Sequence, residues 1–192
     1  MKKIMLLCLA IISLLHSKED FYSEEVLSLY LDKGTKAVGR LLPTNPFQIL
    51  KQEGDWVKIR ISGYNNPQAP FAIYFNDSQR IMVAAFSKDT PLHFTQRVAG
   101  KGGKWDLVSL EVWTEKKDFA KDNQEMFLKA KNLFEQNCGI CHALHKEQEF
   151  GVNQWQSTFR SMVSRTGIDK KDHWLVIEYL QKNAKDFKGG IK

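Results

Sequence analysis

Two cysteines and a histidine in the C-terminal third of the chain have the spacing that is most informative about chemistry. They lie in the run Cys138-Gly139-Ile140-Cys141-His142, where two residues separate the thiols and the imidazole follows directly. Thiols at this spacing can reach the two vinyl groups on one edge of a porphyrin and form thioether bonds. The adjacent imidazole then ligates the iron as its proximal ligand. The run therefore predicts one covalently attached haem c.

Three other chemistries of closely spaced cysteines fit less well. A thioredoxin-type redox pair would follow a β-strand, whereas a helix is predicted before Cys138. A zinc site would need a fourth ligand and usually a second cysteine pair, and the remaining cysteine is Cys8, near the N-terminus. A structural disulfide across two residues would leave the C-terminal segment without a core.

The sixth ligand of the iron stays open between three side chains and a vacant or other site. Met162 follows the motif by twenty residues and is the only methionine after it. A thioether ligand raises the reduction potential relative to two histidines, although a methionine in a helix is often core filler. His145 is too close to His142 to reach the opposite face of the haem, and His173 falls in the first turn of the last predicted helix. Met162 is the predicted ligand.

The segment around the motif has the pattern of short helices. Residues 122–137 contain no glycine or proline and have apolar residues at helical spacing. Trp155, Phe159 and Met162 share one face of a second helix, and residues 170–185 predict a third. Because so short a segment cannot bury a large core unaided, we expect the haem to complete it. Four aromatic side chains are expected to pack on the haem: Phe134, Trp155, Phe159 and Tyr179.

Residues 20–118 have the pattern of a small all-β domain. Val57, Ile59 and Ile61 would share one face of a strand. Many short strands at this spacing favour a barrel or a sandwich. The predicted strands are residues 36–42, 46–52, 55–62, 71–76, 81–86 and 107–114. The tryptophans here are expected to pack in the core or at its rim: Trp56, Trp105 and Trp113.

The first seventeen residues are typical of a cleavable secretory signal peptide. Lys2 and Lys3 give a positive start, and Ile4 to Leu15 follow without a charge. As a helix this stretch would rise about 18 Å, well short of a hydrocarbon core of roughly 30 Å. An uncleaved anchor is the alternative. We therefore expect export to the periplasm, the loss of Cys8, and no membrane span in the mature chain.

Composition and charge narrow the class of protein. The net charge is +6 and 43% of residues are hydrophobic, which excludes a disordered chain or a polytopic membrane protein. The longest basic runs are pairs such as Lys116-Lys117, so no nucleic-acid partner is expected. No nucleophile–base pair or carboxylate pair stands out in the β region. We expect an electron-transfer protein rather than an enzyme.

Parts of both regions resemble known domains. Gly39–Thr44, Phe47–Leu50 and Gly54–Ile59 resemble a bacterial SH3-like domain. Leu133-Phe134 and Ile177–Leu180 resemble the first and last helices of the cytochrome c fold, which cross each other. These resemblances imply an α+β chain with three parts. The parts are a signal peptide (1–17), an SH3-like barrel (20–118) and an all-α monohaem cytochrome c domain (119–192).

A narrower resemblance involves six segments: Cys141–Leu144, Glu149-Phe150, Asn153–Trp155, Met162, Arg165-Thr166 and Tyr179–Asp186. They are similar to the C-terminal monohaem region of TorC-type cytochromes, which a β-rich SH3-like stretch precedes. The resemblance implies a periplasmic carrier of electrons to a molybdenum-dependent reductase of trimethylamine N-oxide or related S- or N-oxides. The family's membrane-anchored multihaem part is absent from this sequence. Either a separate quinol-linked cytochrome or dehydrogenase is the electron donor, or the electrons follow another route.

Three alternatives to this function stay open. The chain could accept electrons from a periplasmic molybdenum oxidase such as a sulfite dehydrogenase. It could be a haem-based gas sensor or ligand-binding module whose β region is the effector, in which case the sixth site would be vacant or easily displaced. The β region could also bind cell wall or peptide, with the cytochrome appended.

Overall fold

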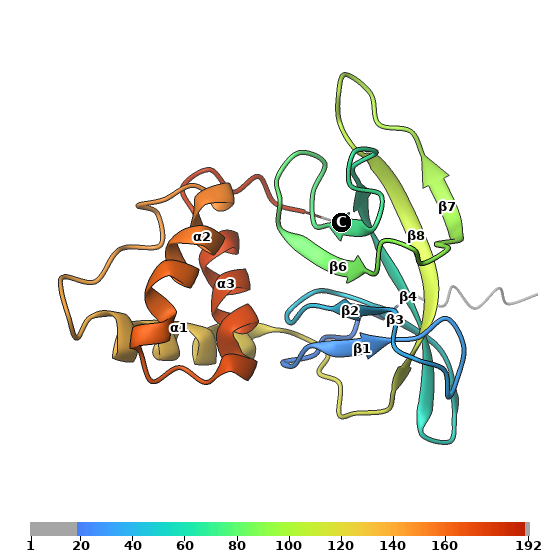
Figure 1. Ribbon diagram of the computed structural model, residues 1–192, viewed down its shortest axis with the longest axis horizontal. Coiled ribbons are helices and arrows are strands. Elements are labelled where there is room, and N and C mark those ends of the chain that lie inside the picture. The colour runs from blue at the N-terminus through green and yellow to red at the C-terminus, as the bar shows by residue number, and fades with distance from the viewer. Residues whose placement is uncertain (1–18, 191–192) are drawn as a thin grey trace, which may run out of the picture.

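Eight strands form one antiparallel sheet in the computed structural model, which describes residues 19–190. The predicted signal peptide and Cys8 lie outside the described residues. The strands follow the order β1-β2-β6-β5-β4-β8-β7, and β3 pairs with the first half of β4 (Figure 1). Their bounds are β1 Leu27–Leu29, β2 Gly39–Leu41, β3 Gln48–Glu53, β4 Trp56–Asn65, β5 Ala72–Tyr74, β6 Met82–Phe86, β7 Phe94–Val98 and β8 Asp106–Glu115.

Alternating side chains explain the long central strand β4. Val57, Ile59 and Ile61 are buried, whereas the residues between them are partly exposed, so the predicted period of two is confirmed. On the other face, Arg60 lies directly opposite Glu111 of β8, with an N–O distance of 2.7 Å. One face of the strand therefore packs into a core while the other carries charge pairs.

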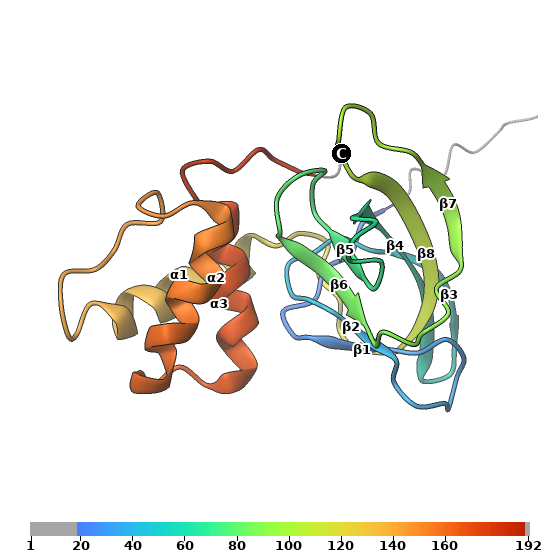
Figure 2. The same cartoon turned by 45° about the horizontal axis from the view of Figure 1, so that its top comes forward.

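The sheet curls so that the end of β1 reaches β8 (Figure 2). Tyr30, directly after β1, exchanges two backbone hydrogen bonds of 2.9 Å with Trp113 of β8. Phe47, between β2 and β3, is fully buried in the resulting core. Trp113 is buried at the edge, whereas Trp56 and Trp105 are half-buried. Their packing positions agree with the prediction for these tryptophans.

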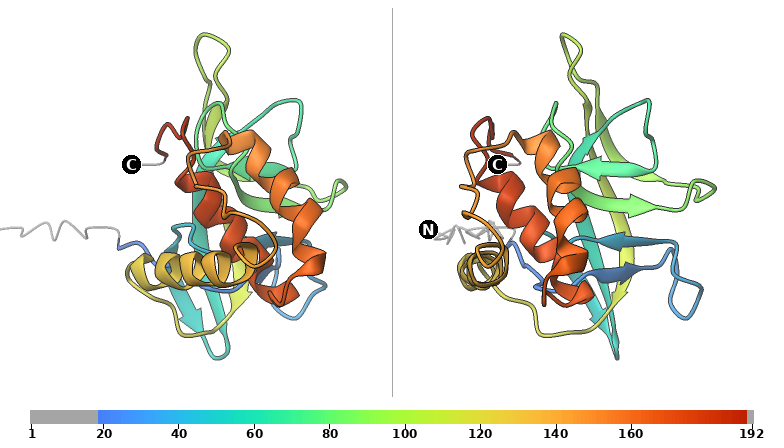
Figure 3. Two further views of the ribbon diagram at one scale, coloured as in Figure 1. Left: turned by 90° about the vertical axis from the view of Figure 1, so that its left-hand side faces the viewer. Right: turned by 60° about the vertical axis from the view of Figure 1, so that its left-hand side comes forward.

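Three short helices form a layer beside one side of the curled sheet (Figure 3). None of the helices in the described residues is long and apolar enough to cross a membrane. The last helix contacts both of the others. The bounds are α1 Gln124–Cys138, α2 Val152–Met162 and α3 His173–Lys182, with single 3₁₀ turns at Val163–Arg165 and Lys170–Asp172.

The predicted fold class, an SH3-like barrel followed by an all-α cytochrome c domain, is wrong. The chain is mostly an eight-stranded antiparallel sheet, and its three helices hold only 15, 11 and 10 residues. The physical reason lies in the core of the helical layer. Side chains of all three helices pack there together with Ile81, which directly precedes β6. The sheet therefore contributes to a core that the prediction had assigned to helices and haem alone.

Candidate haem attachment site

The Cys138–His142 motif begins at the last residue of α1 and continues into an exposed loop. Cys138 is half-buried against the helical core, and burial raises the pKa of its thiol. Cys141 and His142 are exposed, and neither cysteine forms a disulfide within the described residues. The helix therefore fixes one thiol while the loop presents the second thiol and the imidazole to solvent.

One ring nitrogen of His142 is in a hydrogen bond, and the other has no hydrogen-bond partner within the described residues. Its Nδ1 lies 2.8 Å from the carbonyl oxygen of Ala143. Because a carbonyl oxygen only accepts hydrogen bonds, the neutral ring in this contact carries its proton on Nδ1 and a lone pair on Nε2. Metal-ligating histidines generally use this arrangement, in which a backbone carbonyl orients the ring and fixes its tautomer. His142 is suited to bind a metal through Nε2.

Large apolar side chains are exposed beside the motif. Ile140 is 76% exposed and Leu144 is 38% exposed, although both are aliphatic. Exposed aliphatic side chains around two free thiols fit a flat apolar group laid against the loop. Within residues 19–190, no group of three or more His, Cys, Asp or Glu side chains is arranged to hold a metal ion. Two thiols and an imidazole beside exposed aliphatic side chains fit a porphyrin, which the thiols would attach and whose iron the imidazole would ligate.

Met162 lies at the last position of α2 and is half-buried. The segment after α2 lies against the end of α1. Gly167 is so close to Asn137 that a Cβ placed on the glycine would be 3.3 Å from the side-chain oxygen of Asn137. Ile168 and Cys138 also join the same core. Met162 therefore lies only a few residues before a segment that contacts the end of α1, where the motif begins.

The two alternative histidines both have partners. Nε2 of His173 lies 3.2 Å from the carbonyl oxygen of Ile168, and its ring packs on Phe159 with a centroid separation of 5.8 Å. Nδ1 of His145 lies 2.9 Å from a carboxylate oxygen of Glu149. Glu149 has a lowered pKa, chiefly because of this hydrogen bond. To bind iron through the nitrogen named here, His173 would have to break its contact with Ile168, and His145 its contact with Glu149.

The four aromatic residues expected to pack on the haem all belong to the core of the helical layer. Phe134 and Trp155 meet edge to face at 6.0 Å, and both are fully buried. Phe159 is fully buried, and Tyr179 is 7% exposed. Trp155 donates to the carbonyl oxygen of Glu147 at 2.8 Å, and the Tyr179 hydroxyl donates to the Glu147 carboxylate at 2.5 Å. The pKa of Tyr179 is raised, chiefly by burial and secondly by the Glu147 carboxylate.

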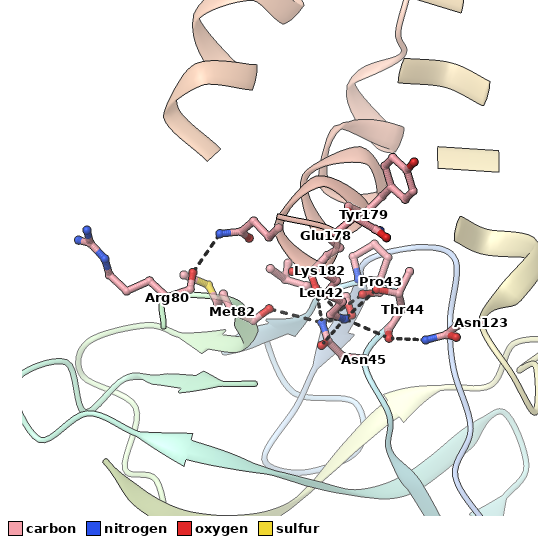
Figure 4. Close-up of polar contacts among 12 residues, drawn as sticks. Leu42, Pro43, Thr44, Asn45, Arg80, Met82, Asn123, Glu178, Tyr179 and Lys182 are labelled. Carbon is pink, nitrogen blue, oxygen red and sulfur yellow. Dashed lines mark hydrogen bonds and ion pairs between the residues drawn. The ribbon is translucent and has the colours of Figure 1, made fainter. Parts of the chain in front are cut away.

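The sequence analysis missed a buried polar network between α3 and the loop before β3 (Figure 4). Glu178 and Lys182 form an ion pair of 2.9 Å, with side chains 0% and 6% exposed. Asn45 accepts from Lys182 at 3.0 Å and donates to Glu178 at 3.3 Å. Lys182 also donates to the Thr44 hydroxyl at 3.0 Å. A glutamate and a lysine four residues apart in an otherwise apolar helix were the available signal.

Burial dominates the electrostatics of this network. It raises the pKa of Glu178 and lowers the pKa of Lys182, because desolvation of each charge outweighs the attraction between them. One carboxylate oxygen of Glu178 has no hydrogen-bond partner within the described residues. The network therefore connects the sheet to the helices at an electrostatic cost.

The sheet, the helical layer and the motif together define a β-rich chain with a c-type haem attachment sequence. The family described as the TorC third cytochrome c domain matches residues 16–119. The chain belongs to this family. The match covers the sheet and ends before α1, so the motif itself lies outside it.

Curated relatives extend the comparison through the helical layer. The cytochrome c-type protein TorC of Escherichia coli (strain K12) is 29% identical over 179 residues, which cover 90% of this chain and 46% of the relative. The cytochrome c-type protein TorY of Haemophilus influenzae is 26% identical over 169 residues, or 86% and 45%. The chain thus spans about half the length of these relatives. No solved structure matches it.

Proposed function

We propose that the chain is a periplasmic monohaem cytochrome c that delivers single electrons to a molybdenum-dependent reductase of trimethylamine N-oxide or a related S- or N-oxide. A quinol-linked cytochrome or dehydrogenase would supply the electrons. Membership of the TorC third cytochrome c domain family supports the electron-transfer class. The observation that carries the proposal is the pair of disulfide-free thiols beside an imidazole whose Nε2 is available.

Each residue of the site has a defined task in this proposal. Cys138 and Cys141 would form the two thioether bonds, and Nε2 of His142 and the sulfur of Met162 would be the axial ligands. When bound, the haem would supply one-electron chemistry through its iron. Glu147 holds the far end of the motif-bearing loop through Trp155 and Tyr179. These contacts limit how far the loop can move when a group is attached to it.

The first experiment tests attachment. The chain is produced in the periplasm with a haem maturation system, and its mass is measured after denaturation. We expect a mass increase of one haem, the loss of this increase in the Cys138→Ser/Cys141→Ser double variant, and intermediate retention in either single variant. A wild-type chain that carries no covalent haem after maturation would refute the proposed site.

The second experiment tests the direction of electron flow. The reduced holo-protein is mixed with purified trimethylamine N-oxide reductase, and reoxidation is followed with and without trimethylamine N-oxide. We expect reoxidation only when enzyme and substrate are both present. A reduced protein that this mixture cannot reoxidise would exclude electron delivery to this reductase.

A further inference from the structure

The solvent-facing side of α2 carries a groove that no carboxylate lines. The groove has a volume of about 330 Å³ and is lined by Arg80, Asn153, Gln156, Ser157, Arg160 and Gln181. The four α2 residues among them are spaced i, i+3, i+4 and i+7, so they share one face of the helix. That face is opposite the buried Trp155 and Phe159. Arg80 comes from the turn between β5 and β6, so the groove lies at the junction of sheet and helices.

The backbone at this junction is held in place by buried amides. Gln181 is 1% exposed and donates to the carbonyl oxygens of Arg80 at 3.3 Å and Val152 at 3.0 Å. The side-chain oxygen of Asn153 accepts from the backbone N–H of Arg80 at 2.8 Å. The side chain of Arg80 extends away from these contacts (Figure 4). A fixed backbone therefore presents an exposed guanidinium group.

The arginines on this side form no ion pair within the part of the chain that the structure describes. Arg80 and Arg160 form no ion pair within residues 19–190, whereas Arg60 and Arg97 of the sheet pair with carboxylates at 2.7 and 3.0 Å. Arg40 of β2 is also without an ion pair in the described part of the chain. Arg40 and Arg160 both lie against the ring of Trp174, at 5.6 and 4.9 Å from its centroid. A guanidinium stacked on an indole keeps its N–H donors available for a carboxylate.

We propose that Arg40, Arg80 and Arg160, here called the arginine face, are the docking surface for a carboxylate-rich surface of the electron-transfer partner. The proposal rests on the proposed function, which supplies the partner. Guanidinium groups bind carboxylates with paired hydrogen bonds, which gives orientation as well as attraction. Complementary charge also speeds the encounter between two proteins. Three exposed arginines that form no ion pair within residues 19–190 provide both effects.

The position of the arginine face suits electron transfer. Behind it, ring contacts lead from Trp155 to Phe150 at 4.9 Å, to His145 at 5.1 Å and to His142 at 5.1 Å. An α-helix with its side chains is about 10–12 Å across. A partner docked on the outer side of α2 is therefore separated from the first of these rings by about one helix.

Charge reversal in the holo-protein tests the proposal. Arg80→Glu/Arg160→Glu is compared with Lys88→Glu/Lys101→Glu, which makes the same change in net charge at exposed positions in the loops before and after β7. The Kd for purified trimethylamine N-oxide reductase is measured at low and at physiological salt. We expect the arginine variant to bind at least about tenfold more weakly with a flatter salt dependence, and the lysine variant to change less than about twofold. Arg80→Lys/Arg160→Lys keeps the charge but loses the paired hydrogen bonds and the stacking, so its affinity should lie between those of the wild type and the glutamate variant.

A second probe separates this inference from the proposed function. Poly-L-glutamate is titrated into the same holo-proteins, and we expect binding that the arginine variant alone loses. If the wild type binds poly-L-glutamate in this way but does not bind the reductase, the proposed partner is wrong, whereas the arginine face is supported as a surface that binds carboxylates. If the arginine and lysine variants bind either probe equally, the arginine face is refuted. A matching far-ultraviolet spectrum for every variant excludes misfolding as the cause of lost binding.

Discussion

At the scale of single residues, the proposed haem site depends on atoms that the fold leaves available. Hydrogen bonding of His142 Nδ1 to a carbonyl frees Nε2, and the two thiols are not in a disulfide. His145 also has its Nδ1 hydrogen-bonded, but it follows His142 by only three residues and cannot reach the opposite face of the haem. The Nε2 of His173 lies against the carbonyl oxygen of Ile168. Met162, half-buried at the end of α2, is therefore the residue to test as the sixth ligand.

Replacement of Met162 by alanine tests this ligand. In the holo-protein we expect loss of the ferric charge-transfer band that marks methionine ligation, together with a lower reduction potential, because a thioether favours ferrous iron. Absorption spectra and potentiometric titration measure the two effects. Met126→Ala is the control, since Met126 is a core side chain of α1 that is 6% exposed. It should lower stability but keep the band. A band that persists in Met162→Ala would disprove the assignment.

The buried Glu178–Lys182 pair predicts an asymmetry between single and double substitution. Glu178→Gln leaves the charge of Lys182 buried without its partner and should lower the free energy of unfolding by about 3 kcal/mol. For a chain of this size that corresponds to a Tm lower by roughly 6–12 °C. Glu178→Leu/Lys182→Met removes both charges and should lie within about 1 kcal/mol of the wild type.

Thermal unfolding of the apo-protein measures these effects. Glu125→Gln is the matched control, because Glu125 is an exposed α1 carboxylate outside the ion pairs of the described residues. It should change the Tm by less than about 2 °C. A double variant that is less stable than Glu178→Gln would show that the pair contributes net stability, contrary to the argument from desolvation.

At the scale of elements, the pairing of β4 with β8 predicts a dependence of stability on pH. Hydrogen bonds from Arg60 and Lys58 lower the pKa of Glu111 from its ordinary value of 4.5. The group therefore contributes stability above pH 4.5, and this contribution is lost as the pH falls through the lower folded-state pKa. The contribution is about 1 kcal/mol or less, because the pair is partly exposed.

Glu111→Gln should therefore weaken the chain near neutral pH and lessen its loss of stability in acid. Urea unfolding at a series of pH values from neutral to strongly acidic measures the difference between the variant and the wild type. That difference should shrink toward zero below the folded-state pKa of Glu111. A difference that stays constant over the whole series would mean that the ion pairs of Glu111 do not account for it.

The elements themselves were largely predictable, because each leaves a local periodic signal. All six predicted strands and all three predicted helices are present. The sequence analysis missed β1, which has three residues, and β7, whose residues are mostly exposed and so show no apolar alternation. Strand order and the packing of helices on the sheet are set by contacts between distant residues. Local patterns do not encode such contacts, and the predicted fold class failed there.

In the candidate site, too, the residues that are close in sequence were predicted and those joined by long-range contacts were not. Cys138, Cys141 and His142 are adjacent in sequence, so their spacing alone predicts their chemistry. The Asn45–Glu178 hydrogen bond joins residues 133 positions apart, and no local pattern predicts that pairing. The arginine face likewise combines β2, the turn before β6 and α2. Residues that act through long-range contacts become visible only once the chain is folded.

At the scale of the whole molecule, contacts at three further places fasten the helical layer to the sheet, in addition to the hydrogen bonds of Arg80 and the contact between Arg40 and Trp174. Ile81 contributes to the helical core, and Asn45 joins the buried network of α3. The third place is the C-terminal segment after α3. Its Asp186 accepts from the backbone N–H of Val152 at 2.7 Å through its side chain and from Gln79 at 2.8 Å through its carbonyl. These contacts predict that sheet and helices open together.

Removal of the C-terminal segment should uncouple the two layers. A chain that ends at Lys185 loses the Asp186 contacts and the stacking of Phe187 on Phe75, whose ring centroids are 6.2 Å apart. In native-state hydrogen exchange we expect amides of α2 and α3 to open at a lower free energy than in the full chain, while β4 and β8 keep their protection. A chain that ends at Gly190 is the control. Equal opening free energies for the helices in the two truncated chains would show that the remaining contacts suffice to join the layers.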